Sequence, residues 1–228
     1  MPELLITQLA STHYRTFLAG LANSFWALLG GLIFSTILGL VCALVTYRDR
    51  GVLNKIIRLY ITIIRNTPFL VQLYICYFGL PSIGIRMNAY ETGVIALTLN
   101  SGAYISDIIK SGLQSVEKGQ IEAAEALGMS AFQRFRFIIM PQSMPQVIPA
   151  AAGQYLIMFQ DTSLMSTISY MELTRSIQDV GSETYLFLEA FIVGGFVYFV
   201  VLNIMEFTTV LLERRFKFKI PKRRAANG

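Results

Sequence analysis

The chain contains a series of long apolar runs, which limit the folds that it can adopt. Each run approaches or exceeds the length of a helix that crosses a hydrocarbon core of about 30 Å. The five runs lie at about 21–46, 56–79, 92–109, 143–160 and 185–212. Only 14% of the residues are charged and 54% are hydrophobic, whereas soluble domains carry about 25% charged residues. We therefore expect an all-α membrane protein with about five transmembrane helices.

The basic residues predict how these spans are oriented. Lysine and arginine gather on the cytoplasmic side of membrane proteins. Fifteen of the nineteen lysines and arginines lie in the connections 48–58 and 110–136 or after residue 213. Only Arg15, Arg86 and Arg175 lie in the segments on the opposite side of the membrane. We expect a periplasmic N-terminus, a cytoplasmic C-terminus and a multi-pass position in a bacterial inner membrane. The net charge of +5 then reflects topology and indicates no nucleic-acid partner.

Three regions follow from this pattern. Residues 1–20 mix polar and apolar side chains and predict a helix lying at the membrane surface, without a cleavable signal peptide. Residues 21–212 form the transmembrane domain, with a polar cytoplasmic loop at about 111–136 and an external segment at 161–184 that we expect to contain a short helix. Residues 213–228 form a basic tail that either contacts anionic membrane lipid or simply anchors the last span.

The cytoplasmic loop contains a short pattern that predicts a helix ending at a glycine. Alanine, leucine and glutamate favour helix, and glycine suits the position after a helix end. The pattern consists of Glu122, Ala123, Ala124, Gly128, Ile138, Met140 and Pro141. A helix with small residues on one face can sit in a groove of another protein, where Glu122 can accept a charge-assisted hydrogen bond. An ordinary amphipathic loop helix is the alternative.

This spacing resembles the cytoplasmic loop of the membrane subunits of bacterial ABC importers. The family pattern reads Glu-Ala-Ala, three residues, Gly, nine residues and Ile-x-Leu-Pro, and Met140 replaces its leucine. In that family the loop is a coupling helix that docks in a groove of the cytoplasmic ATPase. The sequence itself has no G-x-x-x-x-G-K-[ST] phosphate-binding loop. We expect no cofactor in this chain, with ATP bound by a partner ATPase.

Arg65 is the one basic residue left over from this count, and it lies inside the second predicted span. It lies about nine residues into the second span, near mid-membrane at 1.5 Å per residue, where ionisable groups are costly and mark function. Gln72, seven residues on, is predicted to share its helix face, while the segment 66–68 interrupts the span because Pro68 removes a backbone donor. A guanidinium at a broken helix can hold a substrate carboxylate. The alternative is an ion pair with an acidic residue of a neighbouring span, and both can hold in different states.

The third and fourth spans add polar residues at helical spacing. Asn100, Tyr104 and Asp107 are predicted to share one face, with Asn100 deep enough to face a central cavity and Asp107 near the cytoplasmic end in a structural role. Gln154 and Asp161 are seven residues apart. Asp161 suits capping of the next short helix, acceptance of a substrate amino group, or both.

Longer stretches narrow the resemblance to polar amino acid permeases within the ABC importers. The stretches are R-N-T-P-F-L-V-Q-L from residue 65, Y-F-G-L-P from 77, L-T-L-N-S-G-A-Y from 97 and D-T-S-L from 161. The resemblance implies a five-span permease that pairs with an identical or homologous second permease. It also implies a cytoplasmic ATPase dimer, an extracytoplasmic amino-acid-binding protein and transport by alternating access. It carries substrate-binding roles onto Arg65, Thr67, Asn100, Ser101, Gln154, Asp161 and Ser163.

One departure from the family pattern bears on the substrate. Many relatives have asparagine-glutamate where this chain has Gly153 and Gln154, and lysine where it has Gln160. A pocket without that glutamate, beside Arg65, argues against lysine, arginine or histidine as cargo. Residues 159–163 look like those of the glutamate/aspartate permeases. We expect an acidic amino acid, with glutamine or asparagine next.

The sequence disfavours three other classes of function. A stand-alone secondary transporter is disfavoured by five spans without an inverted repeat. A membrane enzyme lacks its chemistry, because the single histidine, His13, has no ligand cluster around it in sequence and no nucleophile neighbours a base. We expect no catalytic and no metal-binding residues. An assembly scaffold is disfavoured by Arg65 within the full signature, although in a heterodimer only one half need bind.

Overall fold

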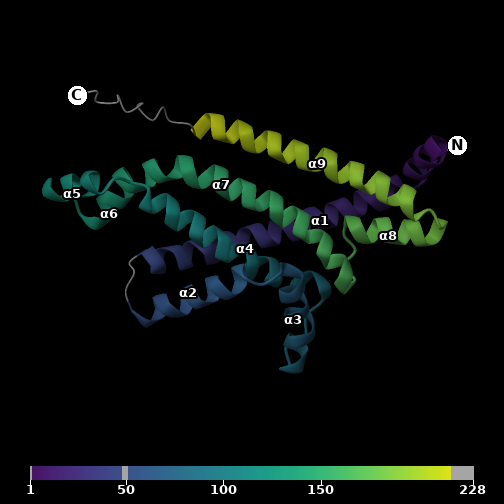
Figure 1. The fold of residues 1–228 in the computed structure, drawn as a ribbon, viewed down its shortest axis with the longest axis horizontal. Coiled ribbons are helices and arrows are strands. Elements are labelled where there is room, and N and C mark those ends of the chain that lie inside the picture. The colour runs from purple at the N-terminus through teal and green to yellow at the C-terminus, as the bar shows by residue number, and fades with distance from the viewer. Residues whose placement is uncertain (1, 48–50, 217–228) are drawn as a thin grey trace.

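The computed structural model describes residues 2–47 and 51–216, and within these ranges the chain is helical and contains no strand (Figure 1). The α-helices are α1 (Pro2–Tyr47), α2 (Val52–Arg65), α3 (Phe69–Ser82), α4 (Ala89–Gln114), α5 (Lys118–Ala126), α6 (Ala131–Arg134), α7 (Met140–Asp161), α8 (Leu173–Thr184) and α9 (Phe187–Phe216). A π-helix, η1 (Phe135–Ile139), precedes α7, and a 3-10 helix, η2 (Thr162–Ile168), follows it. The expected all-α fold is confirmed. Most of the predicted basic tail lies outside the described residues.

The first helix differs from the expected division at residue 20. Residues 2–47 form one uninterrupted helix of 46 residues, so the segment predicted to lie at the membrane surface is continuous with the first span. Gly20 lies inside this helix and does not break it. The candidate span from Leu5 to Tyr47 has 43 residues and is longer than a single crossing requires. The depth of residues 2–20 in a membrane stays a prediction.

The hydropathy of the helices supports two or three spans directly. Within residues 2–47 and 51–216, α1 and α9 are long and apolar enough to cross a membrane, and α2 with α3 would add a third if the bent pair is one span. Helices α4 and α7 have 26 and 22 residues, which is about 39 and 33 Å of helix. They do not meet the same criterion of length and apolarity. The count of five spans stays a prediction.

Helix α4 lies inside the molecule and contacts α1, α2, α3 and α7. Its close approach to α1 depends on small residues, as the run Ser101 to Ala103 predicts. A Cβ added at Gly39 would lie 2.8 Å from the Cβ of Ile105, and one at Gly102 would lie 2.8 Å from a methyl of Leu38. This close packing holds the polar residues of α4 in fixed positions.

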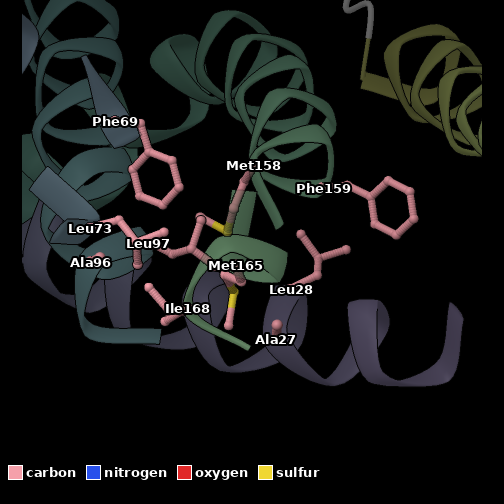
Figure 2. Close-up of a cluster of buried hydrophobic side chains, with 10 residues drawn as sticks. All are labelled: Ala27, Leu28, Phe69, Leu73, Ala96, Leu97, Met158, Phe159, Met165 and Ile168. Carbon is pink, nitrogen blue, oxygen red and sulfur yellow. The ribbon is translucent and has the colours of Figure 1, made fainter. Parts of the chain in front are cut away.

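The main apolar core is formed where five elements meet (Figure 2). Helices α1, α3, α4 and α7 and the 3-10 helix η2 each contribute two side chains. These are Ala27, Leu28, Phe69, Leu73, Ala96, Leu97, Met158, Phe159, Met165 and Ile168. Through Phe69 and Leu73 the core anchors the first turns of α3, whose remaining length points away from the other helices (Figure 1).

The predicted external segment 161–184 contains helices η2 and α8, so the expected short helix is present. Its Glu172 is 0% exposed and caps α8 by accepting the N–H groups of Thr174 at 2.9 Å and Arg175 at 2.8 Å. The hydroxyl of Tyr198 on α9 donates to the same carboxylate at 3.1 Å. Ser24 on α1 accepts an N–H from the first turn of α8 at 3.2 Å. Hydrogen bonds therefore tie this segment to both long helices.

Candidate functional site

The break between α2 and α3 is the centre of the candidate site. The two helices meet at 110°, separated by the segment 66–68. Pro68 adopts φ −63° and ψ 141°, which ends the first helix and starts the second. The side-chain amide of Gln72 donates to the carbonyl of Ile64 at 2.8 Å and to that of Thr67 at 3.0 Å. Two carbonyls at the break are thus satisfied by one side chain.

Arg65 is the last residue of α2, where a cation suits the negative end of the helix dipole. It donates to the carboxylate of Asp107 on α4 and lies over the ring of Tyr104 at 5.4 Å from the ring centroid. The structure therefore shows the ion pair with a neighbouring helix, the alternative to substrate binding. Tyr104 and Asp107 share a face of α4, as their spacing predicts.

The predicted common face of Arg65 and Gln72 is wrong. The 110° bend places the two residues on different helices, so a spacing of seven no longer aligns them. Gln72 instead turns inward, where its carbonyl accepts the side-chain amide of Asn100 at 3.0 Å. The face of α4 that carries Asn100, Tyr104 and Asp107 thus meets both sides of the break.

A second polar pair lies deeper in the molecule. Gln154 on α7 donates to the hydroxyl of Ser101 at 3.3 Å, and both side chains are buried. Asn100 is also buried and is bonded to Gln72. None of Asn100, Ser101 and Gln154 lines the cavity beside Arg65. Asn100 pairs with Gln72, and Ser101 pairs with Gln154. Both pairs are buried and lie apart from the cavity beside Arg65.

Asp161 and Ser163 lie at the junction of α7 and η2, away from the cavity beside Arg65. The predicted capping role of Asp161 is wrong, because its side chain makes no cap hydrogen bond to η2. Its backbone is helical, so the carboxylate does not reach the next N–H groups as an N-cap residue does. Thr67, the remaining predicted site residue, is exposed at the break and accepts from Gln72 at 2.8 Å.

A cavity of about 520 Å³ opens beside Arg65, between the end of α1, helix α2 and helix α4. Its lining is mostly polar and includes the three cations Arg58, Arg65 and Lys110 and the carboxylate of Asp107. The other lining residues are Thr46, Ile61, Thr62, Asn66 and Tyr104. Arg58 donates to the side-chain carbonyl of Asn54 at 2.8 Å. The cavity can therefore receive a small anionic or zwitterionic molecule.

The cytoplasmic pattern forms the predicted helix and its glycine stop. Helix α5 carries Glu122, Ala123 and Ala124, of which Ala124 is buried and the other two are exposed. Gly128 follows with φ +77°, a conformation that favours glycine, and its N–H donates to the carbonyl of Glu125 at 2.9 Å. Pro141 is the second residue of α7 and directly follows the π-helix η1.

The sequence reasoning missed two groups of residues. Leu127, Phe132 and Phe137 project from the loop around α5 and α6 with 83%, 75% and 62% of their surface exposed. Large exposed apolar side chains beside a polar helix can form a protein contact surface. Arg58 and Lys110 line the cavity but were read only as topology signals. The apolar residues inside a polar loop were the available signal for the first group.

Within residues 2–47 and 51–216, no group of three or more His, Cys, Asp or Glu side chains could hold a metal ion. The two cysteines, Cys42 and Cys76, are free.

Comparisons with known proteins agree with this arrangement. Residues 35–218 match the family described as binding-protein-dependent transport system inner membrane component. The chain is 33% identical over 184 residues to the putative glutamine transport system permease protein GlnP of Rickettsia conorii, covering 80% of this chain and 84% of that protein. It is 33% identical over 204 residues to the arginine transport system permease protein ArtQ of Bacillus subtilis, covering 88% and 92%.

A solved structure extends the likeness to three dimensions. The crystal structure of an amino acid ABC transporter with histidines matches with a TM-score of 0.84 and 32% identity, over 90% of this chain and 96% of that one. The relatives are permease subunits and not enzymes. The alternative interpretations of this chain as a membrane enzyme or as a stand-alone carrier are therefore excluded. The chain belongs to the family of binding-protein-dependent transport system inner membrane components and is an amino acid ABC permease, a membrane transport subunit.

Proposed function

We propose that this chain is the transmembrane permease subunit of an ATP-driven importer that carries a polar amino acid, with acidic amino acids favoured, by alternating access. The observation that carries the proposal is Arg65, held at the broken end of α2 beside a polar cavity. Broken helices at membrane depth are where transporters place substrate sites. In this conformation the carboxylate of Asp107 is paired with the guanidinium of Arg65. A substrate carboxylate would replace Asp107 as the partner of Arg65 in another state.

The surface of the cytoplasmic loop at about 111–136 indicates the partner proteins of this chain. Glu122, Leu127 and Phe132 are exposed around α5 and α6, and they offer one carboxylate and two apolar side chains to a groove. We assign this surface to a cytoplasmic ATPase dimer that binds ATP, so this chain needs no cofactor of its own. An extracytoplasmic binding protein would deliver the amino acid, and an identical or homologous permease would complete the transmembrane part.

The placement of elements supports the proposed orientation in a bacterial inner membrane. Helices α5 and α6 and the C-terminal end of α9 lie toward one end of the molecule, and α8 and the start of α1 lie toward the other (Figure 1). A five-span, multi-pass topology with a periplasmic N-terminus and cytoplasmic C-terminus agrees with this division. Basic residues of the connections then fall on the cytoplasmic side.

The substrate class rests on charge. Gln154 is neutral, and the cavity lining carries more cations than carboxylates, which favours an anionic cargo. Relatives are named for glutamine and for arginine, so their names do not decide among acidic, amide and basic amino acids. Glutamine or asparagine remains the next candidate.

A competition assay tests the substrate class. The permease, its ATPase and its binding protein are reconstituted in liposomes, and ATP-driven uptake of labelled glutamate is measured against excess aspartate, glutamine or arginine. We expect glutamate uptake that aspartate suppresses and arginine does not. Uptake of arginine without competition from glutamate or aspartate would contradict the acidic assignment and leave the permease role intact.

A further inference from the structure

The cavity beside Arg65 is lined by charged side chains from two helices. Two helices supply the charges: α2 carries Arg58 and Arg65 seven residues apart, hence on one face, and α4 carries Asp107 and Lys110 three residues apart. The lining therefore has three cations and one carboxylate around about 520 Å³. Pockets for small ligands are typically about 300 to 1,000 Å³.

The groups are arranged so that donors remain for a ligand. Arg65 has five N–H donors in a rigid fork, and its ion pair with Asp107 uses one terminal nitrogen. Lys110 makes no ion pair with any described residue, although it lies one turn from Asp107 on the same helix. The guanidinium of Arg65 also lies over the ring of Tyr104. The cavity thus presents oriented cations to its interior.

We propose that this cavity is a binding site for an acidic amino acid on its way to the cytoplasm, with its carboxylates on Arg65 and Lys110 and its ammonium group on Asp107. An acidic amino acid has two carboxylates and one ammonium group, the complement of a lining with excess cations and one carboxylate. The site rests on the proposed import function and adds Arg58, Asp107 and Lys110 to it. They lie outside the buried pairs formed by Asn100, Ser101 and Gln154.

Asp107 would act as a resident counter-ion for Arg65. When the site is empty, its carboxylate neutralises the guanidinium, as the structure shows. When an amino acid enters, its carboxylate takes the guanidinium and its ammonium group takes Asp107, so one internal ion pair becomes two pairs with the ligand. A basic amino acid has a second cation and finds only one carboxylate, so the site discriminates against it.

The test measures binding of labelled glutamate to the permease–ATPase complex in phosphatidylcholine nanodiscs, without ATP or binding protein. We expect Lys110→Gln to weaken binding at least tenfold. Lys55→Gln is the matched control, because Lys55 is exposed on α2, does not line the cavity and removes the same charge. Asp107→Asn should weaken binding of glutamate but not of glutarate, which lacks the amino group.

Three results would overturn the assignment. The first is equal glutamate affinity in the Lys110→Gln and Lys55→Gln variants. The second is equal loss of glutamate and glutarate binding in Asp107→Asn. The third is Lys110-dependent retention of phosphatidylglycerol, in parallel nanodiscs that contain this lipid, with no glutamate binding, which would assign the cavity to a lipid phosphate. ATP-driven uptake by the wild-type complex is measured in parallel. If uptake persists while the cavity variants bind like wild type, only this site fails, and the import function does not.

Discussion

Replacing Glu172 with glutamine should make the protein more stable at alkaline pH. Glu172 lies in the external segment, outside the predicted spans, and its side chain is fully buried. Burial raises the pKa of Glu172 to about 7, even though the N–H groups of Thr174 and Arg175 and the Tyr198 hydroxyl favour the charged form. The folded protein thus binds this proton more tightly than the unfolded chain does.

The sign and size of the effect follow from linkage. Because the folded pKa is raised above the ordinary value of 4.5, stability is greatest below pH 4.5 and falls as pH rises through about 7. The difference corresponds to roughly 3 kcal/mol, at 1.36 kcal/mol for each pKa unit. Glutamine stays neutral at every pH and keeps one oxygen to accept the capping N–H groups. The variant should match the wild type near pH 5 and exceed it near pH 8.

Thermal unfolding of the purified protein in nanodiscs, followed by intrinsic fluorescence, measures this difference. At roughly 2 to 4 °C of Tm per kcal/mol for a chain of this size, we expect a gain of several degrees at pH 8 and little change at pH 5. Glu183→Gln is the control, since Glu183 is exposed on α8. A variant that is less stable than wild type at both pH values would contradict this prediction and show that the cap needs the charged carboxylate.

Two further predictions concern packing and the helix break. Gly20→Ala should destabilise by about 1 to 3 kcal/mol, because the new Cβ would clash with the Ser176 hydroxyl and lie 3.0 Å from the backbone carbonyl of Glu172. Gly195→Ala, which meets nothing within 4 Å, should not, and equal Tm values for the two variants would contradict this. Gln72→Leu should cost about 1 to 3 kcal/mol by leaving the buried Asn100 amide and the carbonyls at the break unpaired. A Tm unchanged by Gln72→Leu would show that water or another chain satisfies them.

Much of the architecture could be predicted because it depends on local chemistry. Pro68 predicts a break in the second apolar run, and the structure has one. Gly128 predicts the end of the cytoplasmic helix, and its φ of +77° shows why glycine suits that position. The spacing of Tyr104 and Asp107 predicts a shared face, and both meet Arg65.

The predictions that were wrong depend on three-dimensional geometry that the spacing of residues in the sequence does not contain. Proline predicts a break but not its 110° angle, so Arg65 and Gln72 were placed on one face and lie on two helices. Asp161 looked like a cap residue, but its backbone continues the helix and removes that geometry. The continuation of α1 through residue 20 was missed, because a mixed polar and apolar segment can extend a helix as well as start a new one.

We infer that the loop at Glu122 couples to an ATPase while Arg65 serves transport. The most direct measurement is ATP hydrolysis and amino acid uptake by the reconstituted complex, with and without loaded binding protein. We expect Glu122→Lys to uncouple or disassemble the ATPase, and Arg65→Ala to keep the assembled complex but abolish uptake. If neither substitution changes hydrolysis or uptake, the division of roles between these two residues is wrong.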